Sequence, residues 1–273
     1  MAKGVKFKDL LRDELPKDVL ERIPRSFYVV GDIALISLDE DIARRYGSAI
    51  AEAIMRLHPS IKAVYARGPR VGVERVTPLI HLGGERRTLA IHKEYGVRIL
   101  VDIASTYFNP ALGEEHRRVA QLVEDGYGVA DLFTGVGPFA LHIAKLRHCY
   151  VIAIDVNPRA VELLSKSIKM NRLRGVVDPI HGDSIHMLKQ GCFRSQFDAV
   201  IMNLPHVAHE LVPYALKIVK ERGLLHVYTV ARSAEEAVEK VCSSEPRARV
   251  LEVRRVLDYA PRKYIYRVTL SRA

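Results

Sequence analysis

Two glycines and two acidic residues follow three successive apolar runs of this sequence. Gly135 and Gly137 stand in DLFTGVGPFA (131–140), Asp155 ends the next run, and Asp183 follows the third. Glycine allows a sharp turn and a close approach of the backbone to a ligand. A carboxylate placed as Asp155 is, at a strand end, can accept hydrogen bonds from a ribose diol. The set predicts a nucleoside-binding site.

Two alternatives compete with this interpretation. Asp155 could merely cap the helix expected near Pro158, although Asn157 fits that position better. The nucleoside could belong to NAD, because Ala140 is tolerated at the third position of the dinucleotide fingerprint. The acid Asp183 favours S-adenosylmethionine, since in methyltransferase sheets an acid at this strand end reaches the adenine amino group.

A fourth apolar run ends in AVIMNLPHVAHE (199–210), where the reacting groups are expected. Asn203 offers both a donor and an acceptor, and Pro205 stiffens the turn. An exocyclic-amine methyltransferase usually has an aromatic residue after its proline pair, whereas this chain has His206. None of the three cysteines is placed as the nucleophile of an RNA 5-methylcytosine enzyme. His206 and His209 are spaced like a ligand pair, but no third ligand is evident, so no metal is expected.

The elements that must position these residues fall into two parts. From residue 111 to 273, apolar strands alternate with amphipathic helices, which predicts a parallel sheet covered on both faces. Strands are expected over 127–133, 150–155, 176–181, 197–202 and 223–230. Helices are expected over 114–124, 138–147, 158–173, 184–189, 207–221 and 233–243. Residues 247–270 hold two strands with no helix between them, so the last strand should be antiparallel, as in the class I methyltransferase version of the Rossmann-like sheet.

The first 110 residues do not show this regular alternation of strands and helices and instead contain many short strands. Helices are expected over 6–22 and 39–57 and a β-hairpin over 27–38, followed by strands over 61–67, 79–83 and 88–104. We therefore expect a smaller α+β domain, residues 1–110, that positions RNA for a catalytic domain over residues 111–273.

Charge and composition narrow the class of protein. The chain has 273 residues, a formal net charge of +10 and a sequence pI near 9.5, which make nucleic acid the first candidate partner and a merely basic surface the alternative. Three widely spaced cysteines without a CxxC motif argue against a disulfide framework or structural zinc. No apolar run approaches the roughly 18 residues of a membrane helix, and no signal region is present. We expect a cytoplasmic protein without a membrane partner.

The chain resembles the archaeal and eukaryotic tRNA (guanine-37 N1)-methyltransferase family in several blocks that occur in the family's order. The catalytic blocks are DLFTGVGPFALHIAK, AIDVNPRAVELLSKSIKMN, VIMNLPHVAHELVPYAL and GLLHVYT. The upstream blocks GVERVTPLIHLGG and HKEYGVRILVDIASTYFNPALGEEHRR are similar to the family's middle domain and its joint to the catalytic sheet. The resemblance implies methyl transfer from S-adenosylmethionine to guanosine 37, with the tRNA anticodon stem-loop as partner and a monomeric enzyme. The related wybutosine-pathway aminocarboxypropyl transferases, and a non-catalytic RNA-binding protein on the same fold, are the alternatives.

Five residues acquire catalytic roles from this resemblance. Glu115 matches the catalytic carboxylate and would take the N1 proton of guanine; its alternative is a first-turn helix acid. Arg75 matches the arginine that would stabilise charge on O6; its alternative is a phosphate contact. Asn203 and Pro205 match the active-site Asn-Leu-Pro, with Asn203 on the guanine edge. Tyr107 matches an aromatic residue that would stack on the base, or else it is a core aromatic.

The resemblance also implies the cofactor contacts. They are His116, Phe133, Gly135, Gly137, Asp155, Val156, Asp183, Ser184 and Asn203. Two departures from the family pattern are Ala111, where an arginine is frequent, and His116, where an arginine often follows the glutamate. A further small N-terminal domain carried by many members is expected to be absent or reduced to residues 1–25.

Overall fold

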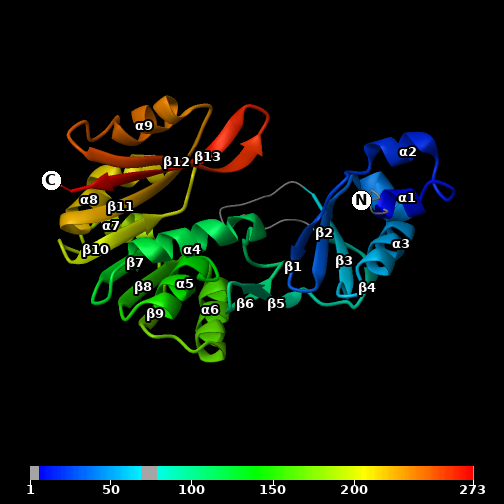
Figure 1. The fold of residues 1–273 in the computed structure, drawn as a ribbon, viewed down its shortest axis with the longest axis horizontal. Helices are drawn as coiled ribbons and strands as arrows, with labels where there is room; N and C mark the ends of the chain where they lie inside the picture. Colours follow the sequence, from blue (N-terminus) through cyan, green and yellow to red (C-terminus); the bar gives the residue numbers. More distant parts are fainter. Residues whose placement is uncertain (1–5, 69–78, 273) are drawn as a thin grey trace, which may run out of the picture. The chain divides into compact units, whose positions relative to one another are not determined.

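The computed structural model describes residues 6–68 and 79–272. The chain divides into two compact units (Figure 1). The first comprises Met1–Lys93 and Leu100–Pro110, and the second comprises Glu94–Ile99 and Ala111–Ala273. Among the described residues, no helix has both the length and the apolar character to cross a bilayer.

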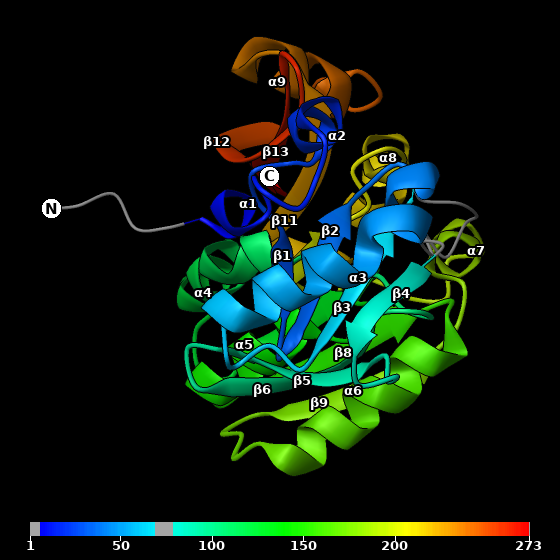
Figure 2. The ribbon, with the colours of Figure 1, turned by 90° about the vertical axis from the view of Figure 1, so that its right-hand side faces the viewer.

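The first unit contains a four-stranded sheet in the order β1-β2-β3-β4. The strands are β1 (Tyr28–Val30), β2 (Ile33–Ser37), β3 (Ala63–Arg67) and β4 (Leu79–Gly84). The expected hairpin is confirmed, since β1 and β2 pair antiparallel. Helix α3 (Glu40–Leu57) connects the parallel strands β2 and β3 and lies across one face of the sheet (Figure 2).

The expected helix over 6–22 is wrong as a single element. The structure has two short helices, α1 (Phe7–Leu10) and α2 (Lys17–Arg22). Pro16 is the N-cap of the second helix, and a proline disfavours helical geometry at the residue before it. Leu11 and Leu15, in the break between the helices, are buried and so still supply the apolar face.

A two-stranded sheet, β5 (Leu89–Glu94) and β6 (Val97–Asp102), lies at the boundary of the two units along the chain. Its turn uses Tyr95 and Gly96, both with positive φ (44° and 80°), which suits a tight hairpin turn. Residues Glu94–Ile99, which include the first half of β6, belong with the second unit, and Leu100–Pro110 belong with the first. A short 3₁₀ helix, η1 (Pro110–Leu112), then leads into the second unit.

The second unit is built on a seven-stranded sheet in the order β12-β13-β11-β10-β7-β8-β9. Its strands are β7 (Gly128–Asp131), β8 (Tyr150–Asp155), β9 (Val176–His181), β10 (Phe197–Met202), β11 (Val219–Ala231), β12 (Arg249–Ala260) and β13 (Lys263–Ser271). Strands β9, β8, β7, β10 and β11 are parallel, and β13 pairs antiparallel with both β11 and β12. The predicted parallel sheet with a terminal antiparallel hairpin is confirmed.

Helices cover both faces of this sheet. They are α4 (Gly113–Leu122), α5 (Pro138–Leu146), α6 (Pro158–Met170), α7 (Ser184–Lys189), α8 (Val212–Ile218) and α9 (Ala234–Cys242). Apolar residues of α7, α8 and α9 share one core with alternate residues of the strands, among them Ala130 of β7 and Ile154 of β8. Helices α5 and α6 contact β8, and α4 packs on α5.

Several boundaries differ from expectation by a few residues, and two of them have a clear physical reason. The first strand of the parallel sheet ends at Asp131 rather than at 133, because the chain turns there toward the glycines. The helix expected over 207–221 is a 3₁₀ turn, η2 (Ala208–Leu211), followed by α8, which ends at Ile218. Val219 pairs with Phe197 of β10, and its carbonyl accepts a hydrogen bond from Arg272 (2.6 Å), so tertiary pairing overrides local helix preference.

Candidate active site

The glycine turn and Asp155 are joined by a direct hydrogen bond. The Gly135 amide donates to Asp155 Oδ2 (2.7 Å), and the Asn157 amide donates to Asp155 Oδ1 (2.9 Å). Gly137 has φ of +80°, and a Cβ there would lie 2.2 Å from Leu164 Cδ1, so this position requires glycine. The cap of α6 is Asn157, whose side chain accepts from the first amides of the helix. Asp155 is therefore not the helix cap; it holds the turn after β7 against the end of β8.

Asp183 and Val156 lie at the ends of the neighbouring strands. Asp183 Oδ1 caps α7, accepting from the amides of Ile185 (2.9 Å) and His186 (3.2 Å), and the side chain is otherwise exposed. Val156 is 48% exposed, which is unusual for an apolar residue directly after a buried strand. Since β7, β8 and β9 are adjacent and parallel, their carboxyl ends share one edge of the sheet.

Two further residues of this edge offer polar atoms. Ser184 is buried, and its Oγ has no hydrogen-bond partner within the described part of the chain. Asp131 is fully buried, its Oδ2 accepts from the Thr134 hydroxyl (2.7 Å), and burial raises its pKa to about 7. We did not single out Asp131 from the sequence; its place as the last residue of β7 before the glycine turn was the available signal. Phe133, in the turn between Asp131 and Gly135, is half-buried.

Glu115 lies in the first turn of α4, but it is buried rather than exposed. Only 4% of its surface is accessible, and its Oε1 accepts from Tyr228 Oη (2.9 Å) and from Arg267 Nη1 (2.8 Å). Its Oε2 lies 3.8 Å from Arg254 Nε and makes no hydrogen bond within the described residues. Burial raises the pKa of Glu115, and the charge of Arg267 opposes that rise. An exposed helix-end acid would have neither a guanidinium in the core nor a raised pKa.

Strand register places the Glu115 cluster close to Asn203. Met202, the last residue of β10, pairs with Val227, so Asn203 and Tyr228 are each one residue further toward the carboxyl edge. The Val230 amide donates to the Pro205 carbonyl (3.3 Å), which ties the Asn-Leu-Pro turn to β11. Tyr228 also pairs with Arg267 across β11 and β13. The structure therefore brings Glu115, Tyr228 and Asn203 to one edge of the second unit.

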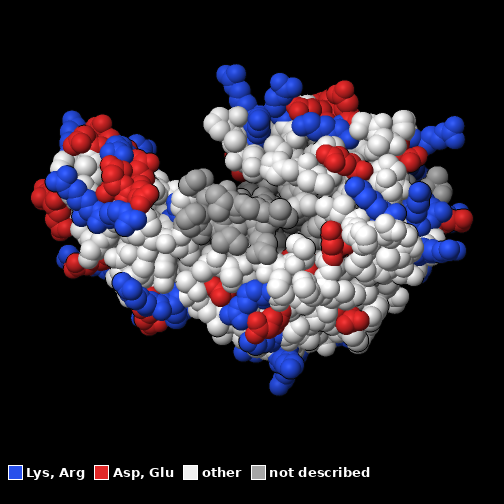
Figure 3. Space-filling model, turned by 180° about the vertical axis from the view of Figure 1, so that it is seen from behind, with Lys and Arg blue, Asp and Glu red and all other residues white. Residues whose placement is uncertain are grey.

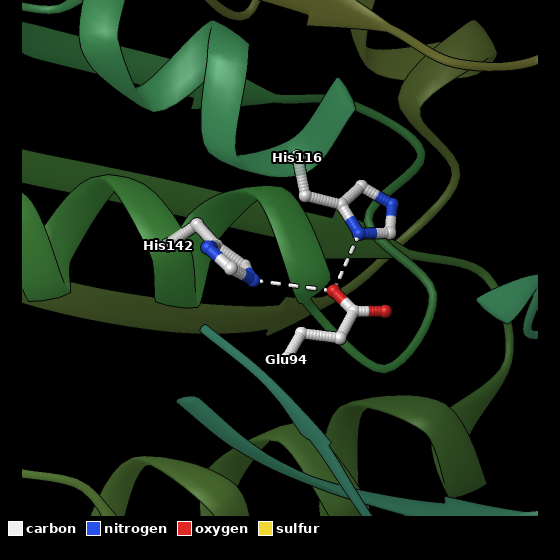
Figure 4. Close-up of side chains that lie close together, drawn as sticks. All are labelled: Glu94, His116 and His142. Carbon is white, nitrogen blue, oxygen red and sulfur yellow. Dashed lines mark hydrogen bonds and ion pairs between the residues drawn. The ribbon is translucent and has the colours of Figure 1, made fainter. Parts of the chain in front are cut away.

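The structure does not bring three of the expected site residues to this edge. Arg75 falls outside the described residues. Tyr107 is half-buried in the first unit. His116 is buried, and its Nδ1 lies 2.9 Å from Glu94 Oε2, in a cluster that also contains His142 (Figure 4). Of the histidine pair noted in the sequence, His206 is exposed and contacts the Tyr259 hydroxyl (3.0 Å).

The sheet has the strand order and the terminal antiparallel strand of a class I methyltransferase. The glycines and acids at the carboxyl ends of β7, β8 and β9 lie where that class binds its cofactor. A family model for the TRM5/TYW2 methyltransferase domain matches residues 90–256, and one for the TYW2 N-terminal domain matches residues 7–88. The chain belongs to the TRM5/TYW2 methyltransferase family.

Individual relatives are similar to this chain in sequence and structure over most of its length. The tRNA (guanine(37)-N(1))-methyltransferase Trm5b of Methanocaldococcus jannaschii is 40% identical over 270 residues, covering 97% of this chain and 76% of the relative. The structure of aTrm5 in complex with tRNALeu has a TM-score of 0.86 at 37% identity and covers all of this chain and 80% of that one. M. jannaschii Trm5 in complex with adenosine has a TM-score of 0.83 at 36% identity, covering 99% of this chain and 80% of that one.

Proposed function

We propose that this chain transfers a methyl group from S-adenosylmethionine to N1 of guanosine 37 in tRNA. The chain belongs to a family of tRNA-modifying transferases, and its relative at 40% identity carries that activity in its name. The structural observation that supports the chemistry is the position of the buried Glu115. Its carboxylate accepts a hydrogen bond from Tyr228, which lies on β11 opposite Asn203 at the end of β10.

The chemistry requires a base, because N1 of guanine carries a proton at neutral pH and is then a poor nucleophile. Glu115 Oε1 is occupied by Tyr228 and Arg267, so Oε2 is the oxygen left to accept that proton. A carboxylate whose pKa is raised by burial is a stronger base than an exposed one. The two hydrogen bonds fix the orientation of the carboxylate before the substrate arrives, which lowers the cost of reaching the transition state.

The edge formed by β7, β8 and β9 suits S-adenosylmethionine, which supplies an electrophilic methyl group on a sulfonium and needs no metal for direct displacement. Each Asp155 oxygen accepts from a backbone amide, which fixes the carboxylate at the strand end where a ribose diol would be held. Val156 presents apolar surface beside it, and the buried Ser184 hydroxyl lacks a partner among the described residues. We assign the adenine end to Asp183 and the rest of the cradle to Phe133, Gly135 and Gly137.

The substrate is tRNA, and we propose that the anticodon stem-loop is the part held at the site. Asn203 would hold the guanine edge on a turn stiffened by Pro205. Tyr107 and Arg75 keep the roles implied by the family resemblance, stacking on the base and stabilising charge on O6. On the face drawn in Figure 3, lysine and arginine side chains are interspersed with acidic ones, so phosphate contacts there would be separate rather than one basic patch. A monomeric, cytoplasmic enzyme and a cofactor contact for His116 stay predictions.

One experiment tests the proposal. The full chain is incubated with methyl-labelled S-adenosylmethionine and an unmodified tRNA transcript, and the nucleosides are identified by mass. We expect label in 1-methylguanosine, and none when position 37 of the transcript is changed to adenosine. Aminocarboxypropyl product, label in another nucleoside, or label that persists in the adenosine-37 transcript would each overturn the assignment.

A further inference from the structure

Three side chains from distant parts of the sequence converge inside the second unit. Glu94 ends β5, His116 lies on α4 and His142 lies on α5, and all three are buried. Glu94 Oε2 is 2.9 Å from His116 Nδ1 and 3.2 Å from His142 Nε2 (Figure 4). The possible ligand atoms of the three residues all lie within 4.8 Å of one another.

We propose that Glu94, His116 and His142 bind a divalent transition-metal ion of the zinc type. Two imidazole nitrogens and one carboxylate oxygen are a donor set that zinc uses in proteins. Bonds of about 2.0–2.2 Å in a tetrahedron place ligand atoms about 3.3 Å apart. The two distances from Glu94 Oε2, 2.9 Å and 3.2 Å, differ from that by a few tenths of an ångström, and the nitrogens of the two rings lie within 4.8 Å of each other.

The electrostatics of the cluster favour a cation. A buried carboxylate loses its hydration, and a cation bound beside it offsets that cost. A divalent ion between the three groups replaces two proton-mediated contacts by coordination and adds positive charge at the point where the carboxylate oxygen and both rings meet. A water molecule can complete four-coordination.

The place of the cluster gives the ion a structural task. A Cβ at Gly113, the first residue of α4, would lie 3.2 Å from Glu94 Cδ, so the carboxylate already packs against the start of this helix. His116 follows Glu115 directly, on the same helix. An ion bound to His116, His142 and Glu94 therefore ties α4 to α5 and to the end of β5. It would hold the helix that carries Glu115 without entering the methyl transfer, and the inference does not depend on the proposed function.

The test uses the untagged full chain, stripped with a chelator and then supplied with zinc. After gel filtration, elemental analysis should find about one zinc ion per chain, and cobalt(II) should give the visible absorption of a low-symmetry, four-coordinate site. A zinc concentration about 100-fold above Kd should raise Tm by about 5 °C. His142→Gln and Glu94→Gln should lose the ion and the Tm rise. His148→Gln, which alters an exposed histidine outside the cluster, should keep both.

Two outcomes would overturn the proposal. Wild-type protein that retains no zinc and gives no cobalt spectrum would leave the cluster as a hydrogen-bonded His–Glu–His network only. Zinc retained equally by wild type and by both cluster variants would place the ion at another site. The cobalt spectrum of wild type tests for a low-symmetry, four-coordinate site even if a variant fails to fold. Binding of S-adenosylhomocysteine checks that each variant is folded.

Discussion

The Glu115 carboxylate accepts a hydrogen bond from the Arg267 guanidinium (Nη1 to Oε1, 2.8 Å) in the core of the second unit. Arg267 is fully buried. Burial lowers the pKa of Arg267, but Glu115, Tyr228 and Glu252 together outweigh it, so this pKa is raised and Arg267 stays a cation. The pair fixes one carboxylate oxygen, and it makes Arg267 a positioning residue for the proposed base.

The first prediction concerns the acid side of the pH–rate profile. Arg267 is the strongest of the charges that oppose the burial-raised pKa of Glu115; Arg254 and Arg118 act in the same direction more weakly. Arg267→Met should therefore raise that pKa further. Because the ionised carboxylate is the active form, the rise of single-turnover methyl transfer with pH should move to higher pH, and the rate should partly recover on the alkaline side.

The matched control is Arg255→Met, which removes an exposed arginine paired with Asp258 and should leave the profile in place. Both variants are measured in chelator-treated protein, so that a bound metal ion cannot shift the profile. An equal loss of rate at every pH in Arg267→Met would show that Arg267 supports folding but does not tune Glu115.

The second prediction concerns cofactor binding. Asp155→Ala removes the acceptors proposed for the ribose and also releases the Gly135 amide, which Asp155 holds at 2.7 Å. We expect the substitution to cost about 1–3 kcal/mol in total, so the affinity for S-adenosylhomocysteine should fall by about 5- to 150-fold in calorimetry. Asp178→Ala, which changes an exposed aspartate within β9, should bind as wild type does. Unchanged affinity in Asp155→Ala would remove this residue from the site.

The third prediction concerns the net charge of +10. If it serves phosphate contacts, the affinity for tRNA should fall steeply between about 50 and 200 mM salt, by at least about tenfold. Affinity for S-adenosylhomocysteine, measured in the same buffers, should change little. This small ligand makes few ionic contacts that salt could screen. A flat salt dependence of tRNA binding would contradict an electrostatic tRNA surface.

The sequence predicted the architecture well because local patterns determine it. Apolar runs bounded by glycine and acids located β7, β8, β9 and β10, and the missing helix before β13 predicted its antiparallel direction. Asn157 was correctly identified as the cap of α6. Two expectations failed, one for a local and one for a tertiary reason: Pro16 divides the first helix, and the pairing of Val219 with Phe197 shortens α8.

The polar clusters could not be predicted in this way. Arg267 is 152 residues from Glu115, and Tyr228 is 113 residues away, so only the folded sheet brings them together. The same holds for Glu94, His116 and His142, whose spacing resembles no metal motif. In the sequence, the spacing of His206 and His209 resembles a ligand pair more closely. Which side chains meet is decided by the packing of strands and helices, which spacing does not show.

The most direct test of the account is the rate of methyl transfer by Glu115→Gln. Glutamine keeps the length of the side chain and an oxygen that can accept from Tyr228 and Arg267, but it cannot take the N1 proton. At saturating tRNA and cofactor, rapid-quench single-turnover rates should fall by about 10²–10⁴-fold, with tRNA and S-adenosylhomocysteine affinities nearly unchanged. The remaining rate should also lose its rise with pH. Methyl transfer at the wild-type rate in Glu115→Gln would contradict the account and leave Glu115 as a buried structural partner of Arg267.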